Sequence, residues 1–280
     1  MSKVTEVNLP VTQPIKALDL LVGQVDLSKN RLKEAMSKGA VWRQRSGRTS
    51  RIRRGSAVLQ PGDLLVMYHN PQALASVPPE PTLICDRTTY SVWYKPPGLM
   101  CSGTRYADHC SISRVVQVAK DRPVFLVHRL DRFTAGLLVL GHSKKVAGLL
   151  SRQFAERKVI KLYQARVKGQ ISGSHTVEVP IEGKPARSLV KVVRTGQESI
   201  VSVRIETGRK HQIRRHLAEL GHPVVGDRLY GDGAGGEGGE GGADLQLVAV
   251  YLGLECPESG QWVQFSLPRS HCLADIDRPD

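Results

Sequence analysis

Cysteine is scarce in this chain, and the few present are not spaced as in disulfide frameworks or zinc sites. Five cysteines are spread over 280 residues, and no two of them form a CxxC pair. Small secreted domains and zinc-binding modules use cysteine far more densely. We therefore expect a reducing compartment, mostly structural thiols, and neither disulfide bonds nor a metal site.

Long apolar segments are also missing. The longest, such as residues 135–140 and 245–249, fall far short of the roughly 18 residues that a membrane-spanning helix needs. Residues 1–10 lack the basic start, apolar run and cleavage site of a secretory signal. We expect a soluble, cytoplasmic protein with no membrane partner, folded as one large or two small domains.

Acidic residues are few beside the basic ones. The chain has 26 Asp and Glu against 40 Lys and Arg, a formal net charge of +14, and residues 29–54 contain a single acid, Glu34. A solvated charged face is the alternative interpretation, but so unequal a ratio favours binding to the phosphates of a nucleic acid. The residues that we expect to contact the nucleic-acid backbone are Lys29, Arg31, Lys33, Lys38, Arg43 and Arg45.

The first 70 residues predict two short helices followed by strands. Apolar residues recur at helical spacing over 15–25, and Ser28 is a candidate cap for a second, basic helix that ends at Gly39. Residues 41–42, 56–59 and 64–68 are typical of short strands. Over residues 13–70 this order, with its PGD turn, is similar to the S-four-type RNA-binding domain, named after a small-subunit ribosomal protein.

Prolines divide the chain after this region. Pro71, Pro78, Pro79 and Pro81 cannot continue a helix or a central strand, so we interpret residues 70–81 as a linker. The predicted organisation is an S-four-like domain over 1–75, a proline-rich linker over 76–81 and a larger domain over 82–280.

The larger domain mixes strands and helices without a strict alternation. The predicted strands are 90–94, 124–128, 136–140, 160–167 and 201–207, and the predicted helices are 144–154 and 211–220. Residues 231–242 contain eight glycines and predict a flexible surface loop. Their GxGxxG spacing does not indicate a dinucleotide site, because no helix follows it.

Four polar clusters stand in or beside apolar strands of the larger domain. KPPGL at 95–99 is a rigid turn, and HRLDRFTAG at 128–136 places Asp131 among arginines, which alone fits a structural ion pair. KLYQARVKG at 161–169 places Tyr163 on an apolar face, where a core role is the alternative. TGRKHQIRRH at 207–216 begins a helix and indicates an anion-binding point. Its two histidines lack the glutamate of HExxH, which argues against zinc.

Taken in this order, the clusters closely resemble the RluA/RsuA-type pseudouridine synthases, and most nearly their RluA branch. The resemblance covers about residues 82–270 and includes PIEGKPA at 180–186 and GHPVVGD at 221–227. The chain departs from the family pattern at Phe133, where an acid is usual, and at Ala135, where serine is usual. An S-four-like domain at the amino terminus is a common attachment in this family.

The resemblance implies an α+β fold, in which a mixed, largely antiparallel sheet and its helices surround a central cleft. It implies the isomerisation of a uridine in RNA without any cofactor or metal. Asp131 is then the essential carboxylate, by attack on the ribose, addition to the uracil ring or removal of a ribose proton. Tyr163 should lie over the uracil, and Arg214 should pair with Asp131.

Substrate contacts follow from the same resemblance. Arg129 should fill the space that the extruded uridine leaves in the base stack. The other substrate-binding residues that we expect are His128, Arg209, His211, Gln212 and Lys95. The appended domain favours ribosomal RNA over transfer RNA as the partner, and a monomer is the default state.

Two other classes of protein remain open. One is a non-catalytic RNA-binding or ribosome-assembly protein, for which the basic surface would suffice. The other is a hydrolase that uses Asp131 with His128 or His211, but the GxSxG nucleophile elbow is absent.

Overall fold

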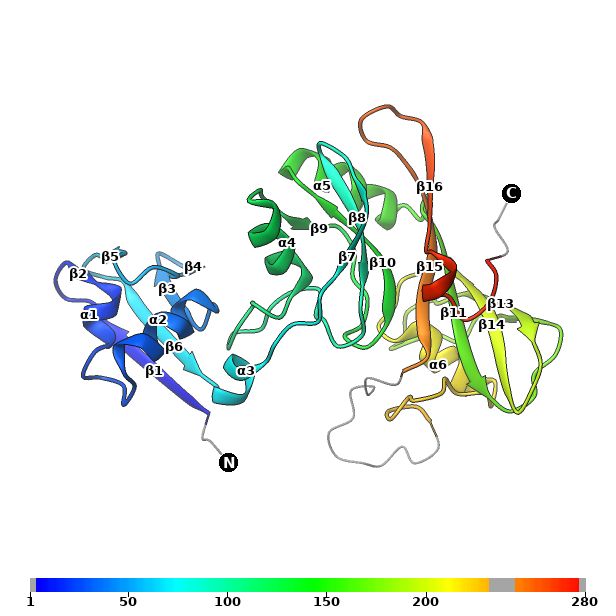
Figure 1. Ribbon diagram of the computed structural model, residues 1–280, viewed down its shortest axis with the longest axis horizontal. Coiled ribbons are helices and arrows are strands. Elements are labelled where there is room, and N and C mark those ends of the chain that lie inside the picture. Colours follow the sequence, from blue (N-terminus) through cyan, green and yellow to red (C-terminus); the bar gives the residue numbers. More distant parts are fainter. Residues whose placement is uncertain (1–3, 232–244, 277–280) are drawn as a thin grey trace. The chain divides into compact units, whose positions relative to one another are not determined.

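The computed structural model describes residues 4–231 and 245–276. The glycine-rich segment predicted as a flexible loop lies, apart from Gly231, outside the described residues. The chain forms two compact units, one of Met1–Pro78 with Ser102–Val115 and one of Pro79–Cys101 with Val116–Asp280 (Figure 1).

The first unit is built around a four-stranded antiparallel sheet in the order β1-β6-β3-β4. A short ladder of β2 with β5 and three short helices complete it. Buried aliphatic side chains from the first two helices and the sheet form its core. The elements are β1 (Thr5–Pro10), β2 (Ile15–Lys16), α1 (Ala17–Leu21), α2 (Lys29–Ser37), β3 (Val41–Arg45), β4 (Arg48–Arg51), β5 (Val58–Leu59), β6 (Leu64–His69) and α3 (Pro71–Ala75).

Local signals explain the helices of this unit, with two corrections. The predicted second helix is confirmed, since the Ser28 hydroxyl accepts a hydrogen bond from the Arg31 amide at 3.4 Å and α2 follows. The first predicted helix is shorter than expected, because residues 15 and 16 pair in β2 instead. The predicted linker contains a helix, α3, because proline is tolerated in a first turn and Asn70 caps it by accepting from the Ala73 amide at 3.0 Å.

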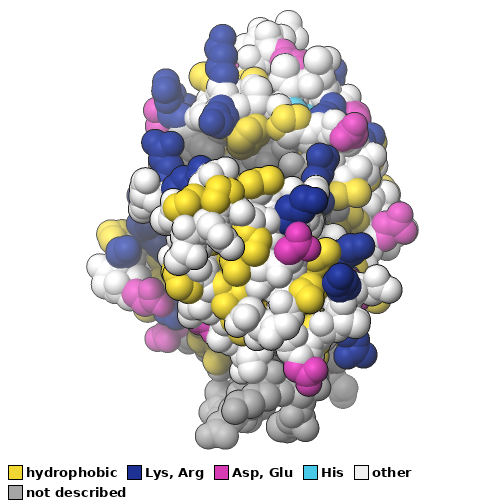
Figure 2. Space-filling model, turned by 90° about the vertical axis from the view of Figure 1, so that its left-hand side faces the viewer, with side chains coloured by type: hydrophobic (Ala, Val, Ile, Leu, Met, Phe, Trp, Pro, Cys, Tyr) yellow, Lys and Arg dark blue, Asp and Glu magenta, His cyan; other side chains and the backbone are white. Residues whose placement is uncertain are grey.

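The surface of the molecule mixes basic and apolar side chains. On the face shown in Figure 2, lysine and arginine side chains lie on both sides of a group of exposed hydrophobic side chains, and acidic side chains are fewer. Among the exposed residues of the first unit are three basic side chains of α2, namely Lys29, Arg31 and Lys33.

The second unit is one mixed, largely antiparallel sheet, as predicted, and it has ten strands among the residues that the structure describes. Its order is β12-β13-β14-β11-β15-β10-β8-β7, with β16 paired to β15 and β9 paired to β10, and only β10 and β15 run parallel among its described pairs. Its strands are β7 (Thr82–Asp86), β8 (Tyr90–Lys95), β9 (Phe125–Leu126), β10 (Ala135–Gly141), β11 (Ile160–Lys168), β12 (Ser174–Val177), β13 (Ser188–Arg194), β14 (Glu198–Ile205), β15 (Leu247–Glu255) and β16 (Trp262–Ser266).

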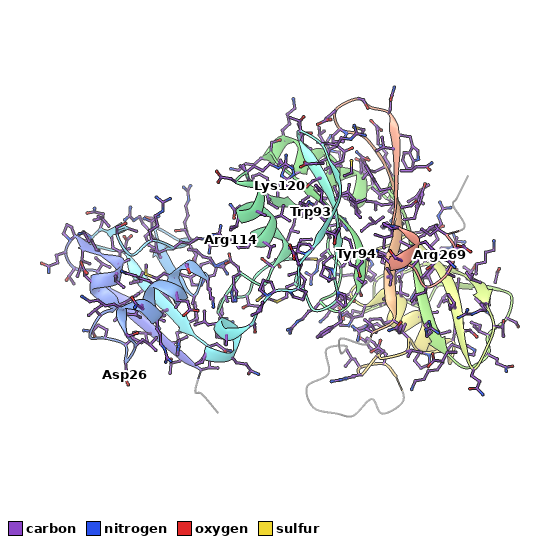
Figure 3. All side chains as sticks on the ribbon, viewed as in Figure 1. Asp26, Trp93, Tyr94, Arg114, Lys120 and Arg269 are labelled. Carbon is purple, nitrogen blue, oxygen red and sulfur yellow. The ribbon has the colours of Figure 1, made fainter. Side chains whose placement is uncertain are left out.

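Helices α5 (Lys144–Ala155) and α6 (Gln212–Glu219) confirm the two predicted helices of this unit. Helix α4 (Ile112–Lys120) and strands β7, β12, β13, β15 and β16 were not predicted. The ammonium of Lys120 lies 5.8 Å from the ring centroid of Trp93 in β8, a pair that Figure 3 labels.

A close approach of two strands fixes the loop that carries Asp131. Gly136 in β10 has a φ of +123°, and a Cβ there would lie 2.3 to 2.7 Å from backbone atoms of Ala249 in β15. Only glycine fits this crossing. The loop between β9 and β10 is therefore anchored at its carboxyl end by the sheet itself.

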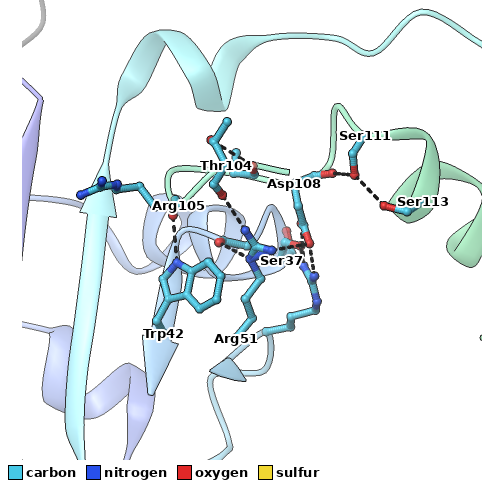
Figure 4. A network of polar contacts seen from close by, with 11 residues as sticks. Ser37, Trp42, Arg51, Thr104, Arg105, Asp108, Ser111 and Ser113 are labelled. Atoms are coloured by element: carbon cyan, nitrogen blue, oxygen red, sulfur yellow. Dashed lines mark hydrogen bonds and ion pairs between the residues drawn. The ribbon is translucent and has the colours of Figure 1, made fainter. Parts of the chain in front are cut away.

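The first unit includes a segment, Ser102–Val115, that comes later in the chain (Figure 4). Its Asp108 side chain is largely buried and accepts from Arg51 at 2.9 Å and from Arg53 at 3.1 Å. The indole of Trp42 donates to the Arg105 carbonyl at 2.8 Å, and the Arg51 guanidinium lies 4.0 Å from the indole ring centroid. Two arginines of the predicted basic patch are therefore bound to a carboxylate of the protein.

Candidate active site

One cavity of about 690 Å³ in the second unit gathers most of the predicted site residues. Its walls come from the loop before β10, from β11, from the end of α5 and from the start of α6. The predicted residues that line it are His128, Arg129, Asp131, Tyr163, Arg209, His211, Gln212 and Arg214.

Asp131 faces two cationic or protonatable groups without a short hydrogen bond to either. Its Oδ2 lies 3.9 Å from Nη1 of Arg214, and its Oδ1 lies 3.9 Å from Nε2 of His211. The side chain is 26% exposed, and it lines the cavity. The carboxylate oxygens are thus close to positive charge and still accessible to a bound group.

Arg214 has a stronger partner than the one predicted. Its Nε and Nη2 donate to Asp227 at 2.7 and 2.8 Å, a bidentate pair that is almost completely buried. Burial alone would raise the pKa of Asp227, but the Arg214 hydrogen bonds hold that pKa below its usual range. Arg214 directs only its remaining nitrogen to Asp131, because two edges of the planar guanidinium can serve two carboxylates.

Tyr163 lies on the cavity-facing side of β11. Its side chain is buried, and burial, reinforced by the nearby Asp131 carboxylate, raises its pKa. The phenol is therefore neutral at physiological pH. It presents a flat apolar ring and a polar hydroxyl beside the carboxylate.

His211 is held by a hydrogen-bonded chain at the start of α6. The Arg215 guanidinium donates to the Tyr230 hydroxyl at 2.9 Å, so the hydroxyl hydrogen is available to His211 Nδ1, which lies 3.0 Å away. A neutral imidazole that accepts at Nδ1 carries its hydrogen on Nε2, the atom that faces Asp131. Burial also lowers the pKa of His211, which favours the neutral ring.

Gln212 lines the cavity, but its polar atoms are bound within the protein. Its carbonyl oxygen accepts from the Thr207 hydroxyl at 2.7 Å and from the Arg209 amide at 3.0 Å, and its amide nitrogen donates to the Arg187 carbonyl at 2.9 Å. A fourth bond joins it to Ser188 at 3.0 Å. These bonds occupy the side chain that we expected to bind substrate, and they fix the turn that begins α6.

His128 is part of the cavity wall. Its Nε2 accepts from the Val139 amide at 3.0 Å, and its ring stacks on Phe154 with centroids 4.3 Å apart. Burial, with a smaller effect of Lys161, lowers its pKa to about 3. A ring that stays neutral and accepts from the backbone cannot act as the base of a hydrolase.

Lys95 does not line the cavity, contrary to its predicted role as a substrate contact. Its fully buried ammonium donates to the carbonyls of Pro96, Leu99 and Arg132 at 3.1, 2.8 and 2.9 Å. Burial lowers its pKa to about 8. Lys95 therefore ties the turn after β8 to the residue next to Asp131.

The remaining two predicted residues differ in exposure. Arg129 is exposed at the cavity, whereas Arg209 is partly buried and donates from Nε to the Pro185 carbonyl at 3.0 Å. Sequence reasoning missed Asp227 and Tyr230 as members of the site. An acid directly after an apolar stretch was the available signal for Asp227.

The six residues predicted to contact an RNA backbone fall into two groups. Lys29, Arg31 and Lys33 are exposed on α2. Lys38 is bound to Glu34 at 2.6 Å, and Arg45 is paired with Asp63, whose pKa is lowered to about 2 chiefly by this hydrogen bond. Arg43 is only partly exposed and lies beside Ser50 in the neighbouring strand.

Within residues 4–231 and 245–276, no cluster of three or more His, Cys, Asp or Glu side chains could hold a metal ion. None of the helices in these ranges is both long and apolar enough to cross a membrane.

Comparison with known proteins agrees with this geometry. Residues 89–219 match the family described as RNA pseudouridylate synthase. An uncharacterized RNA pseudouridine synthase of Chloroflexus aurantiacus is 39% identical over 164 residues, which are 51% of this chain but only 49% of that protein. The dual-specificity RNA pseudouridine synthase RluA of Vibrio parahaemolyticus is 34% identical over 66% of this chain and 77% of its own length.

A solved structure supports the same assignment. Human RNA pseudouridylate synthase domain containing 1 superimposes with a TM-score of 0.57 at 26% identity, over 68% of this chain and 83% of that one. The sheet, its cavity and these likenesses define an RNA-modifying isomerase. The chain belongs to the RluA-type RNA pseudouridine synthases, enzymes that form pseudouridine in RNA.

Proposed function

We propose that this chain isomerises specific uridines of ribosomal RNA, as a monomer in the cytoplasm. The observation that carries the proposal is an accessible carboxylate, Asp131, in a cavity whose other groups are a neutral tyrosine and a firmly held arginine. Neutral uracil and its ribose need no metal to bind there. The reaction breaks the bond from the ribose to nitrogen 1 and joins the ribose to carbon 5 of the same base. Carbon 5 loses its proton and nitrogen 1 gains one, so the product is an isomer of the substrate.

In this proposal Asp131 drives cleavage of the glycosidic bond. Arg214 Nη1 and His211 Nε2, each 3.9 Å away, stabilise the ionised carboxylate without blocking its oxygens. Asp227 holds the Arg214 guanidinium in place from the opposite edge. This arrangement is preorganised, which is how an enzyme places charge without reorganising in each turnover.

Tyr163 confines the detached uracil. A flat, buried ring next to Asp131 lets the base rotate in its own plane and prevents its escape. Arg129, exposed at the cavity, occupies the gap that the extruded uridine leaves in the RNA stack. Extruding the uridine costs a few kcal/mol. The exposed cations of α2 bind backbone phosphates and contribute affinity that does not depend on sequence.

Ribosomal RNA is proposed because the small first unit resembles an S-four-type RNA-binding domain in its order of helices and strands. Dual specificity is a property of the Vibrio relative. Mapping pseudouridines in ribosomal and transfer RNA from cells with and without this chain tests the proposal. Loss of ribosomal sites supports it, and loss confined to transfer RNA would contradict it.

A further inference from the structure

Lys161 is a buried cation in the cavity wall. Its side chain is 9% exposed and lines the cavity two residues before Tyr163 on β11. Its two neighbours in the strand, Ile160 and Leu162, pack into the core on the opposite side of the sheet. Throughout the part of the chain that the structure describes, no carboxylate lies within ion-pair distance of its ammonium.

A second cation lies nearby and makes this placement more costly. Arg157 is exposed, follows α5 with a φ of +59°, and lines the same cavity. Burial lowers the pKa of Lys161, and the Arg157 charge lowers it further. Glu206, the other acid that lines the cavity besides Asp131, is bound to Arg187 at 3.0 Å. An unpaired buried cation is unfavourable for folding, so a bound anion is the natural counter-charge.

The cavity wall therefore carries two chemically different groups of charge. One is Asp131 with its partners, and the other is the pair of cations, of which Lys161 lies near His128. Uracil is neutral, whereas each RNA phosphate carries a full negative charge, and lysine binds phosphate as a compact point charge. We propose that Lys161, together with Arg157, binds a backbone phosphate adjacent to the uridine that enters the cavity. This inference rests on the proposed function, because it takes the substrate to be RNA.

The test compares Lys161→Gln and Lys161→Arg with the wild-type chain on a short RNA that contains one target uridine. We expect Lys161→Gln to raise KM about tenfold and to change kcat less than about twofold, because a charge-assisted contact is lost in ground and transition state alike. Lys161→Arg should restore most of the affinity. Lys158→Gln is the matched control, because Lys158 is exposed and already paired with Glu156 at 2.8 Å, and its KM should not change.

Neutral methylphosphonates, placed singly on the 5′ or the 3′ side of the target uridine, identify the phosphate. The wild-type chain should bind one of the two modified RNAs more weakly than the unmodified RNA. Lys161→Gln, which already lacks the contact, should bind that modified RNA and the unmodified RNA with equal affinity. A loss of kcat without a change of KM, or equal sensitivity of both chains to either substitution, would overturn the inference.

Two further measurements keep the result interpretable. Lys161→Met should melt at the same or a higher temperature, since it removes an unpaired buried charge, and a clear loss of stability would show a structural role instead. Anisotropy titrations with the same RNAs report the phosphate contact without turnover. If no uridine is isomerised but these titrations show the predicted pattern, the proposed function fails and the phosphate site stands.

Discussion

Two carboxylates share the guanidinium of Arg214, and they do so unequally. Asp227 takes two short hydrogen bonds in a buried position, whereas Asp131 lies 3.9 Å from the third nitrogen. The buried pair fixes the arginine, and the more exposed carboxylate is left accessible. Asp227 is thus a positioning residue for the charge environment of Asp131.

Asp227→Asn should lower both stability and activity. The substitution keeps the shape but leaves Arg214 without its buried counter-charge, which typically costs about 3 to 5 kcal/mol in unfolding free energy. Denaturant unfolding and turnover of uridine-containing RNA measure the two effects. Glu182→Gln is the control, because its pair with Arg215 is exposed and contributes at most about 1 kcal/mol. Unchanged unfolding and an unchanged rate for Asp227→Asn would contradict this role.

Acid should weaken the first unit through Asp63. The Arg45 hydrogen bond, helped by the Gln60 amide, lowers the pKa of Asp63 from 3.8 to about 2. A carboxyl with a lowered folded-state pKa adds stability that is complete above pH ~4 and lost as the pH falls to about 2. Hydrogen exchange of β6 amides between pH 5 and pH 2 should show this loss. In Asp63→Asn the β6 amides should be less protected from exchange at pH 5, and their protection should change less below pH 4. If protection falls equally with pH in the variant and the wild-type chain, the assignment is refuted.

At the scale of elements, the crossing of β10 and β15 positions the catalytic loop. These strands are parallel and are paired at Ala135 and Gly136, immediately after the loop that contains Asp131. The absence of a side chain at Gly136 allows the contact with Ala249. The sheet thereby fixes how far the Asp131 loop stands from β11.

Gly136→Ala should disrupt this crossing. The added Cβ meets backbone atoms that cannot move independently, and its φ disfavours any other residue, so we expect a loss of several kcal/mol in unfolding free energy. Gly148→Ala is the control, because nothing lies within 4 Å of a Cβ there and alanine favours the α5 helix by about 1 kcal/mol. Thermal melting compares them, and equal melting temperatures would contradict the packing argument.

Sequence patterns predicted the elements with strong local signals. Helix α2 was predicted from Ser28 and its apolar face, and the strand that carries Tyr163 from its length and apolar content. Strands β12 and β13 pair with each other and β13 pairs with β14, but they were not predicted, because they are partly exposed and mix polar with apolar residues. Asp131, Tyr163 and Arg214 were brought to one cavity as the motif order implied. The prediction that Lys95 binds substrate was wrong, because a sequence does not show that three backbone carbonyls surround a lysine.

At the scale of the whole molecule, the chain passes three times from one compact unit to the other. The segment Ser102–Val115 belongs to the first unit, where Asp108 is held by Arg51 and Arg53. Removing the first 77 residues would therefore leave Asp108 without its arginines. The same ion pairs reduce the basic charge that is available for RNA, and they leave the exposed cations of α2 among the candidates.

Replacing Lys29, Arg31 and Lys33 together by glutamine should reduce the salt dependence of RNA binding. If each contacts one phosphate, the slope of log K against log salt should fall by about 2 to 3, since each contact contributes ~0.7 to 0.9. Filter binding across a salt series measures the slope. Lys38→Gln should change it little, because Glu34 already faces that ammonium. An unchanged slope for the triple variant would mean that α2 is only a solvated face.

The most direct test of the central claim follows the hydrogen on carbon 5 of uridine. Ribosomal RNA made with tritium at that carbon should release tritium to water when the wild-type chain acts, because carbon 5 becomes the point of attachment to the ribose. Asp131→Asn should bind the same RNA with nearly unchanged affinity and release none, since the substitution removes the reacting charge and keeps the shape. Measurable tritium release by a folded Asp131→Asn chain would contradict the assignment of Asp131 as the catalytic carboxylate.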